Sequence, residues 1–192
     1  MSGRKIDRNL ENPIDNIIID LCEALNPLWK KLGFTPNTLT FFSLVLGVYG
    51  LYIIWTKKQY KLGATLFLIA YILDCADGNY ARKYKMYSKF GDYFDHIGDL
   101  IKHTLMFLLI LILPISTPIK IFILVLLGIL VLLLNIHLGA QQCFAKGDTS
   151  VLNNLKFLCR KKEDIKFLRY FGVGTFELVV FLILFNLGMI VN

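Results

Sequence analysis

Long runs of apolar residues, separated by short basic segments, are the feature that most limits how this chain folds. A helix needs about 20 residues to cross roughly 30 Å of hydrocarbon, because each residue adds about 1.5 Å. With 56% apolar and 18% charged residues and a mean hydropathy of +0.58, the 192-residue chain lies outside the range of soluble domains. We therefore predict an all-α, polytopic membrane bundle. The five predicted spans are approximately Leu39 to Trp55, Leu62 to Ala81, Tyr93 to Leu113, Ile119 to Ala140 and Gly172 to Val191.

The segment before the first run is predicted to be an amphipathic helix. From Ile14 to Leu32, apolar residues recur at intervals of three and four, with charged residues between them. Pro27 is expected to kink or interrupt this helix. An amphipathic helix that holds a tryptophan, here Trp29, is typical of a helix lying in the membrane interface. Packing against a soluble neighbour would produce the same pattern and stays open as an alternative.

The chain is predicted to be a single integral-membrane domain, residues 1–192, made of an interfacial arm (1–33) and a bundle (34–192). Thr35 is placed to cap the first span, with Pro36 at an allowed first helical position. The polar first thirteen residues lack the apolar core of a secretory signal, so we expect no cleaved signal peptide. Between the fourth and fifth runs, the stretch around Val151 to Leu158 is expected to form another surface helix. The alternative is that this region holds a sixth membrane span.

Charge indicates the orientation and the partner. The net charge is +7, but the basic residues form short clusters between apolar runs, which favours a negatively charged membrane surface over nucleic acid. One side of the predicted spans holds 16 Lys and Arg residues and the other side 4. Because cytoplasmic loops hold the excess, the N-terminus and the loop after the second run should face the cytoplasm. The membrane would be the endoplasmic reticulum in a eukaryote or the inner (plasma) membrane in a bacterium.

Acidic residues stand in and beside the second and third runs, where charge usually marks function. Asp74 and Asp77 lie near the end of one run, and Asp95 and Asp99 lie near the start of the next. Because a short loop joins the two runs, they should form an antiparallel hairpin with both acidic pairs at one depth. Intervals of three and four place each pair on one helix face. The four carboxylates are therefore predicted to converge between the two helices.

Such a cluster calls for cations, because four negative charges in a partly dehydrated cleft repel one another. Oxygen ligands without His or Cys at matching positions favour Mg²⁺ or Mn²⁺ over zinc. Two such ions about 3.5 to 4 Å apart would hold a pyrophosphate and neutralise charge as a phosphorus–oxygen bond breaks. Small residues on the same faces leave room for a ligand or for close helix packing. Arg82 is placed to meet either a phosphate or lipid headgroups.

The stretch from Asp74 to Asp99 resembles the signature of the CDP-alcohol phosphotransferase family, DxxDGxxAR, eight residues, then GxxxDxxxD, at every defining position. The resemblance implies an enzyme that transfers a substituted phosphate from a CDP-alcohol to an acceptor alcohol and releases CMP, in phospholipid synthesis. It implies that Asp99 is both a metal ligand and the general base for the incoming hydroxyl. The implied metal ligands are Asp74, Asp77, Asp95 and Asp99, and the implied CDP-binding residues are Gly78, Ala81, Arg82, Gly91 and, from a Pro-Asn pair that resembles the start of the family's first span, Asn37.

The alcohol stays open between two branches. The sequence DHIGD, with His96 after Asp95, resembles the DHGCD of choline and ethanolamine phosphotransferases, which use diacylglycerol as acceptor, and it favours that branch. The short chain is closer to the enzymes that transfer a phosphatidyl group from CDP-diacylglycerol to inositol, serine or glycerol phosphate. A homodimer also stays open. The interior polar residues are expected either to pair with one another or to touch substrate; these are Lys102, His103, Asn135, His137 and Glu177.

Two other classes of protein were weighed. A cation or proton transporter would also place carboxylates inside a helical bundle, but it predicts acidic groups spread through the membrane depth or paired in repeated halves. Here the acidic residues cluster at one end of two runs, and the chain has no internal repeat. A non-catalytic scaffold or lipid-binding membrane protein gives no reason for four carboxylates at this spacing. We therefore expect an enzyme.

Overall fold

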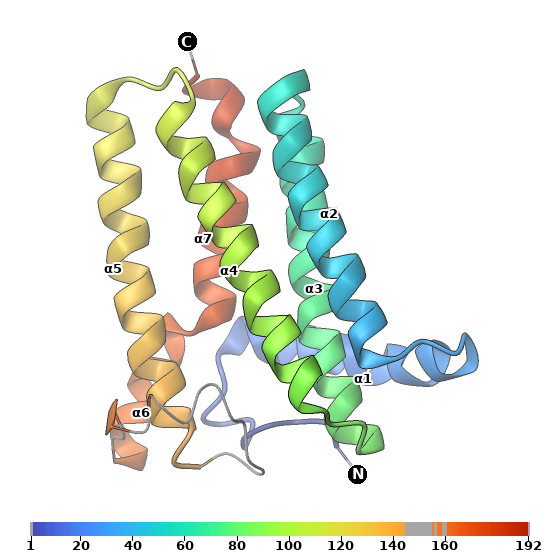
Figure 1. The fold of residues 1–192 in the computed structure, drawn as a ribbon. Helices are drawn as coiled ribbons and strands as arrows, with labels where there is room; N and C mark the ends of the chain where they lie inside the picture. The colour runs from blue at the N-terminus through green and yellow to red at the C-terminus, as the bar shows by residue number, and fades with distance from the viewer. Residues whose placement is uncertain (1, 145–154, 156, 159–160, 192) are drawn as a thin grey trace.

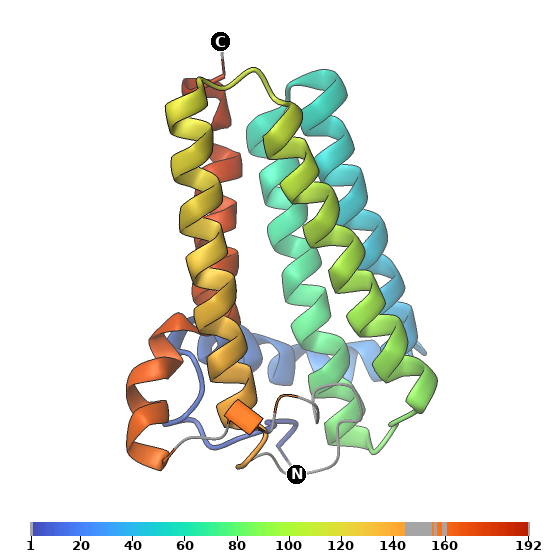
Figure 2. The same ribbon diagram turned by 60° about the vertical axis from the view of Figure 1, so that its left-hand side comes forward.

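The computed structural model describes residues 2–144, 155, 157–158 and 161–191. Helices α2, α3, α4, α5 and α7 stand side by side, and α1 lies across one end of them (Figures 1 and 2). We refer to that end, which also holds α6 and the turn between α3 and α4, as the base. The predicted all-α bundle with a separate N-terminal helix is confirmed. The helices are α1 (Pro13–Lys31), α2 (Pro36–Lys57), α3 (Tyr60–Tyr84), α4 (Lys89–Ile112), α5 (Thr117–Gln141), α6 (Lys162–Leu168) and α7 (Val173–Phe185), with 3₁₀ turns at Arg169–Phe171 and Leu187–Met189.

Four of the described helical stretches are long and apolar enough to cross a membrane: Pro36–Lys57, Tyr60–Tyr84, Thr117–Gln141 and Glu163–Phe185. The predicted third span corresponds to α4, which has 24 residues and stands among the others (Figure 1), although its first half carries the acidic residues. Its length fits a span, although Asp92, Asp95 and Asp99 lie along its first half and Lys102 follows them. The chain is thus an integral membrane protein in which α3 and α4 each carry half of the acidic motif.

The predicted fifth span needs a correction. The helix α7 ends at Phe185 rather than continuing to Val191, and Leu187–Met189 form a 3₁₀ turn. At this point Asn186 turns its side chain back to donate to the carbonyl of Leu182 at 2.8 Å, which satisfies a group at the helix end. The surface helix predicted around Val151 to Leu158, and with it the sixth span, lies mostly outside the described residues.

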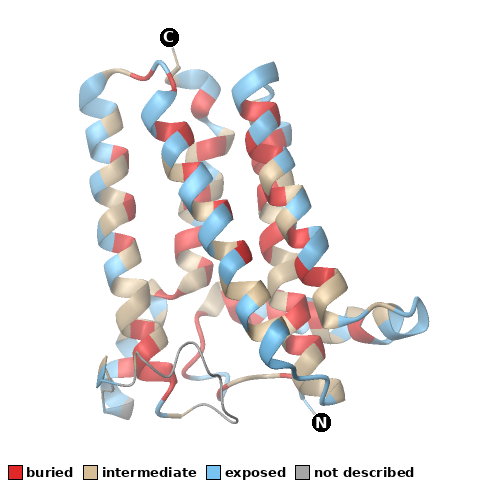
Figure 3. Ribbon diagram, in the orientation of Figure 1, coloured by how far each residue is buried: buried red, intermediate tan, exposed pale blue. Residues whose placement is uncertain are grey.

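Buried residues lie between the helices and exposed residues lie on their outer faces (Figure 3). One apolar cluster lies between the bundle helices, with Ile54, Met106 and Leu184 fully buried. A second lies between α1 and the helices α2 and α3. On the outside, large apolar side chains stay exposed, including Phe122 and Leu132, each 67% exposed on α5. Contiguous apolar surface of this kind is rare on soluble proteins. It is the surface that a lipid bilayer would cover.

The helix α1 continues through Pro27, so of the predicted kink or interruption the interruption does not occur. A proline inside a helix has no N–H for the carbonyl four residues earlier. Here that carbonyl belongs to Glu23, and it accepts a hydrogen bond from Lys83 Nζ of α3 at 3.2 Å. A tertiary contact thus replaces the missing helical bond. Ile17, Leu21 and Leu28 remain exposed on α1, as expected for a helix in the membrane interface.

Small residues and caps hold the first three bundle helices in register. Thr35 caps α2, with its hydroxyl accepting from the amide of Thr38, as predicted. Higher up, α2 and α3 approach so closely that a Cβ on Gly50 would lie 2.6 Å from the carbonyl oxygen of Gly63. At the base, the left-handed residue Lys85 ends α3, and Ser88 caps α4. This short turn brings the end of α3 beside the start of α4.

Candidate functional site

A cavity of about 330 Å³ opens at the base, between α1 and the bundle. Its walls come from the N-terminal arm, from α1 to α5, from the turn between α3 and α4, and from Val173 at the start of α7. All nine residues that the sequence implied as metal ligands or CDP-binding residues line this cavity. These residues are Asn37, Asp74, Asp77, Gly78, Ala81, Arg82, Gly91, Asp95 and Asp99.

The structure brings three of the four carboxylates to one point. Asp74, Asp95 and Asp99 each offer an oxygen within 4.8 Å of the others. Asp77 stands apart from this trio because its Oδ2 accepts a hydrogen bond of 2.5 Å from Thr40 on α2, and the residue is only 4% exposed. The predicted convergence is therefore closest for the trio, with Asp77 in the same cavity and oriented by a hydroxyl.

The acidic trio includes a buried oxygen that lacks a partner. Asp95 Oδ1 is inaccessible to solvent and accepts no hydrogen bond among the described residues. A buried carboxylate oxygen without a donor costs free energy unless something else binds it. Together with an all-oxygen donor set, this orphaned atom fits a hard divalent cation such as Mg²⁺ or Mn²⁺.

Lys102 and His103 of α4 pair with acidic residues inside the bundle, which is one of the two alternatives left open by the sequence. Lys102, only 4% exposed, lies 2.8 Å from Asp74 Oδ1 and 2.9 Å from Asp99 Oδ1. His103 Nε2 lies 2.7 Å from Glu177 on α7, and its Nδ1 faces the carbonyl of Asp99 at 2.8 Å. Charged groups at membrane depth are thus paired with one another.

The predicted nucleotide end of the cavity depends on glycines. A Cβ on Gly91 would lie 2.7 Å from Asn37 Oδ1, and a Cβ on Gly78 would lie 3.1 Å from the guanidinium of Arg82. Asn37 and Arg82 therefore occupy the space that larger residues at these positions would need. Arg82 Nε donates to the carbonyl of Gly3 at 2.6 Å, so the arginine is anchored to the N-terminal arm instead of extending to lipid headgroups.

Lys5 of the N-terminal arm is a second cation on the cavity wall. Burial, followed by the nearby charge of Arg82, lowers the pKa of Lys5 to about 8. Sequence reasoning missed this residue because the arm precedes the first helix and has no periodic pattern. Only the return of the arm across the base brings Lys5 beside Arg82.

The α1 side of the cavity was also missed. Glu11 accepts a hydrogen bond of 2.9 Å from Gln141 on α5, while Asp15 accepts from the Tyr71 hydroxyl on α3 and, at 3.1 Å, from the amide of Gly174 on α7. Burial, reinforced by Glu11, raises the pKa of Asp15 to about 7. One signal was available, because Asp15 is an acidic residue in the first turn of α1, shortly before the apolar residues Ile17 to Ile19.

Polar residues on α2 form another group, in which Asn37 was predicted and Thr40 and Ser43 were missed. Asn37, Thr40 and Ser43 recur at intervals of three in an apolar span, which places them on one helix face. Thr40 contacts Asp77, and Ser43 Oγ lies 3.4 Å from Asp74 Oδ1. This face of α2 therefore supports the two aspartates of α3, and its spacing was a signal that sequence analysis could have used.

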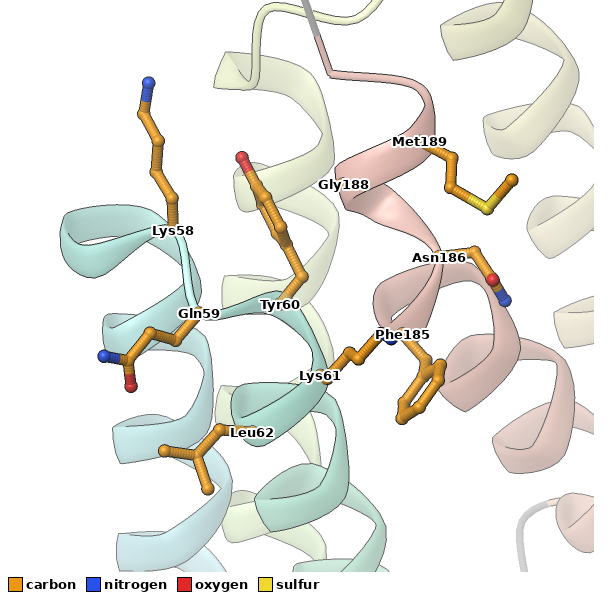
Figure 4. A pocket seen from close by; sticks show the side chains of 9 residues that line it. All are labelled: Lys58, Gln59, Tyr60, Lys61, Leu62, Phe185, Asn186, Gly188 and Met189. Atoms are coloured by element: carbon orange, nitrogen blue, oxygen red, sulfur yellow. The ribbon is translucent and has the colours of Figure 1, made fainter.

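A second cavity, of about 590 Å³, lies at the opposite end of the bundle (Figure 4). Lys61 extends over the ring of Phe185, with Nζ 5.5 Å from the ring centroid. No acidic side chain is among its lining residues, so the carboxylate chemistry of the base is missing there. The lining residues are Lys58, Gln59, Tyr60, Lys61, Leu62, Phe185, Asn186, Gly188 and Met189.

Comparison with known proteins identifies the family. The model of the family described as CDP-alcohol phosphatidyltransferase matches residues 34–188, which include α2 to α7 and all nine predicted site residues. The chain belongs to the CDP-alcohol phosphatidyltransferase family. The match begins where the interfacial arm ends, and it covers the acidic hairpin on which the resemblance was based. Family membership agrees with the expectation of a membrane-bound transferase of phospholipid synthesis.

Two curated relatives are similar to part of the chain. Both carry the name CDP-diacylglycerol–glycerol-3-phosphate 3-phosphatidyltransferase, one from Rickettsia typhi (strain ATCC VR-144 / Wilmington) and one from Rickettsia prowazekii (strain Madrid E). Each is 41% identical to this member of the CDP-alcohol phosphatidyltransferase family over 66 residues, which are 33% of this chain. The matched part spans only 37% and 36% of the two relatives, respectively.

Proposed function

We propose that this chain transfers a phosphatidyl group from CDP-diacylglycerol to a small polar alcohol and releases CMP. The observation that carries the proposal is the trio Asp74, Asp95 and Asp99, whose oxygens lie within 4.8 Å of one another in a cavity at the base. Family membership supports the donor class, since a CDP-alcohol has a pyrophosphate that such a trio can bind through metal. The apolar exterior of the bundle supports a donor that stays in the membrane.

The carboxylates have distinct roles in this proposal. Asp74, Asp77, Asp95 and Asp99 hold Mg²⁺ or Mn²⁺, which when bound neutralises the charge that develops on the pyrophosphate. Asp99 is also the general base, because its side chain is 38% exposed against 19% for Asp74. An incoming hydroxyl therefore reaches Asp99 more readily than Asp74.

The reaction balances without a covalent enzyme intermediate. The acceptor oxygen forms a bond to the β-phosphorus while Asp99 takes the hydroxyl proton. The bond between the β-phosphorus and the oxygen that bridges to CMP breaks, and CMP leaves with that oxygen. Asn37, Gly78, Ala81, Arg82 and Gly91 line the nucleotide end of the cavity, where the two glycines leave space and Arg82 supplies a positive charge.

We propose glycerol 3-phosphate as the first acceptor to test. The names of the two relatives support it, and so do Lys5 and Arg82, which add positive charge to the cavity. The second candidate is the amino-alcohol branch, suggested by the histidine that follows Asp95. That histidine, His96, turns Nδ1 toward the carbonyl of Asp92 on its own helix at 2.7 Å, so it gives the second candidate little support.

The excess of basic residues at the base supports a site that faces the cytoplasm. The two relatives are bacterial proteins, which supports the inner (plasma) membrane as the location. Membrane lipids surround the bundle in this proposal, and a homodimer remains a prediction that a mass measurement in detergent would test.

The test is CMP release by the purified full chain with Mn²⁺ or Mg²⁺. We expect release with CDP-diacylglycerol and glycerol 3-phosphate, and little with CDP-choline or CDP-ethanolamine and diacylglycerol. Asp99→Asn and Asp74→Asn should abolish release while the protein keeps its helical circular dichroism. Asp164→Asn is the matched control, because Asp164 is an exposed residue of α6. Full activity in either site variant, or no release from any donor, would overturn the proposal in favour of a transporter or scaffold.

A further inference from the structure

The ammonium of Lys102 lies inside the acidic cluster, within hydrogen-bonding distance of three acceptors. Its ammonium lies 2.8 Å from Asp74 Oδ1, 2.9 Å from Asp99 Oδ1 and 2.9 Å from Ser43 Oγ. An ammonium has three protons, and these three acceptors use all of them. With 4% of the residue exposed, this lysine has no proton left for a lipid headgroup or a substrate phosphate.

The packing of α2 against α4 leaves space for the Lys102 side chain. Gly47 on α2 faces the lysine stem, and a Cβ there would lie 2.9 Å from Cδ and 3.1 Å from Cγ of Lys102. Any larger residue at position 47 would push against the middle of the stem, close to the backbone of α4. Because Gly47 has no side chain, the stem of Lys102 fits beside α2, and its ammonium lies between α2 and α3.

The position of the ammonium bears on how many divalent ions the site holds. Lys102 pairs with one oxygen of Asp74 and one oxygen of Asp99. A second divalent ion next to the first would need oxygens of these same two carboxylates. A divalent ion there would meet a positive charge at close range and compete for the same oxygens. Asp95 Oδ1, which has no partner among the described residues, is left for the first ion.

We propose that Lys102 is a built-in cation that takes the place of one of the two divalent ions expected from the sequence. The proposal rests on the metal-dependent transfer proposed above and refines it. Without substrate, the site holds one divalent ion, bound through Asp95 and the remaining carboxylate oxygens. Lys102 is a positioning residue, because it acts by holding Asp74 and Asp99 and does not contact the reacting atoms.

The test is the number of Mn²⁺ ions bound by the full chain in detergent without substrate, followed by electron paramagnetic resonance. We expect about one tightly bound Mn²⁺ per wild-type chain and about two in Lys102→Met, because the variant keeps most of the stem and loses the charge. Lys102→Arg keeps the charge and should stay at about one. Two tightly bound ions in the wild type, or no gain in Lys102→Met, would overturn the proposal.

A second variant keeps the test decisive if Lys102→Met fails to fold. Gly47→Ala leaves the lysine in place but pushes its stem, so it should also increase Mn²⁺ binding. The matched control is Gly128→Ala on α5, where an added Cβ meets nothing within 4 Å and binding should not change. Unchanged Mn²⁺ binding in a folded Gly47→Ala protein would count against the proposal.

CMP release, measured in parallel on the wild type, separates the two proposals. If the wild type releases CMP and Lys102→Met binds the same number of ions as the wild type, only the role of Lys102 is wrong. If the wild type binds Mn²⁺ as expected but releases no CMP from any donor, the proposed transfer is wrong. The two failures therefore have different signatures.

Discussion

Thr40 Oγ1 on α2 donates a hydrogen bond of 2.5 Å to Asp77 Oδ2 on α3. The bond joins two helices whose residues are 37 positions apart, and it is buried. It fixes one oxygen of Asp77, a residue that lines the cavity. A hydroxyl in the first span thus orients a carboxylate that the family signature assigns to the metal site.

Removing this hydroxyl should weaken the site while leaving the fold intact. A hydrogen bond to a charged group contributes about 1.5–3 kcal/mol. Thr40→Val keeps the shape of the side chain, and we expect CMP release to fall about 10- to 100-fold. The control is Thr56→Val on the same helix, because the Thr56 hydroxyl donates to the Tyr52 carbonyl one turn earlier within α2. Equal activity in the two variants would show that the bond to Asp77 is dispensable.

Gly91→Ala should impair donor binding. Its new methyl group would lie 2.7 Å from Asn37 Oδ1 and 2.9 Å from Ser88 Oγ, so Asn37 must move away from the cavity wall. We expect the KM for CDP-diacylglycerol to rise by about tenfold, with a smaller change in kcat. Gly98→Ala, on the same helix, is the control, because an added Cβ there meets nothing within 4 Å. A normal KM in Gly91→Ala would contradict a role for this contact.

Gly63→Ala should destabilise the bundle. Its Cβ would collide with the carbonyl oxygen of Gly50 and lie 2.5 Å from Ile54 Cγ1, so α2 and α3 would have to separate. Overpacking of this kind costs about 1–3 kcal/mol. The measurement is the thermal unfolding midpoint in detergent, with Gly128→Ala as the matched substitution at an open position. A midpoint equal to that of the control would mean that the two helices can move apart at little cost.

Stability should fall as the pH rises from about 4 to 7 through Asp15. Its pKa is about 7 in the folded protein, because of burial, against an ordinary value of 3.8. Between these values the unfolded chain has released the proton that the folded chain keeps, so rising pH favours the unfolded state. We expect Asp15→Asn to flatten this dependence and to raise the unfolding midpoint at pH values above about 7.

Asp20 gives the opposite sign and serves as the control for Asp15. It is exposed on the same helix, and hydrogen bonds from Arg8 and then Arg4 lower its pKa. A lowered pKa gives stability that is lost as the pH falls, so Asp20→Asn should leave the loss between about pH 4 and 7 in place. A wild-type midpoint that rises steadily toward pH 8 would contradict the assignment to Asp15.

Much of the site was predictable because helices have a fixed period. Intervals of three and four residues place Asp74 with Asp77 and Asp95 with Asp99 on single faces. The short turn capped by Ser88 then brings the two faces together. The eight predicted residues of α3 and α4 line one cavity for this reason, and Asn37 joins them from α2. The boundary of the last span was not predictable in the same way, since apolar composition continues past the point where Asn186 ends α7.

The sequence by itself determined the class of the protein, its helical membrane bundle and the acidic hairpin, because run length and local spacing follow from the geometry of a single helix. The tertiary structure decided which groups surround the carboxylates. Thr40 holds Asp77 apart from the trio, Lys102 enters the cluster through the space left by Gly47, and Lys83 supplies the hydrogen bond that Pro27 removes from α1. These contacts join residues far apart in the chain, and they depend on how closely and in which rotation the helices pack, which no local pattern encodes.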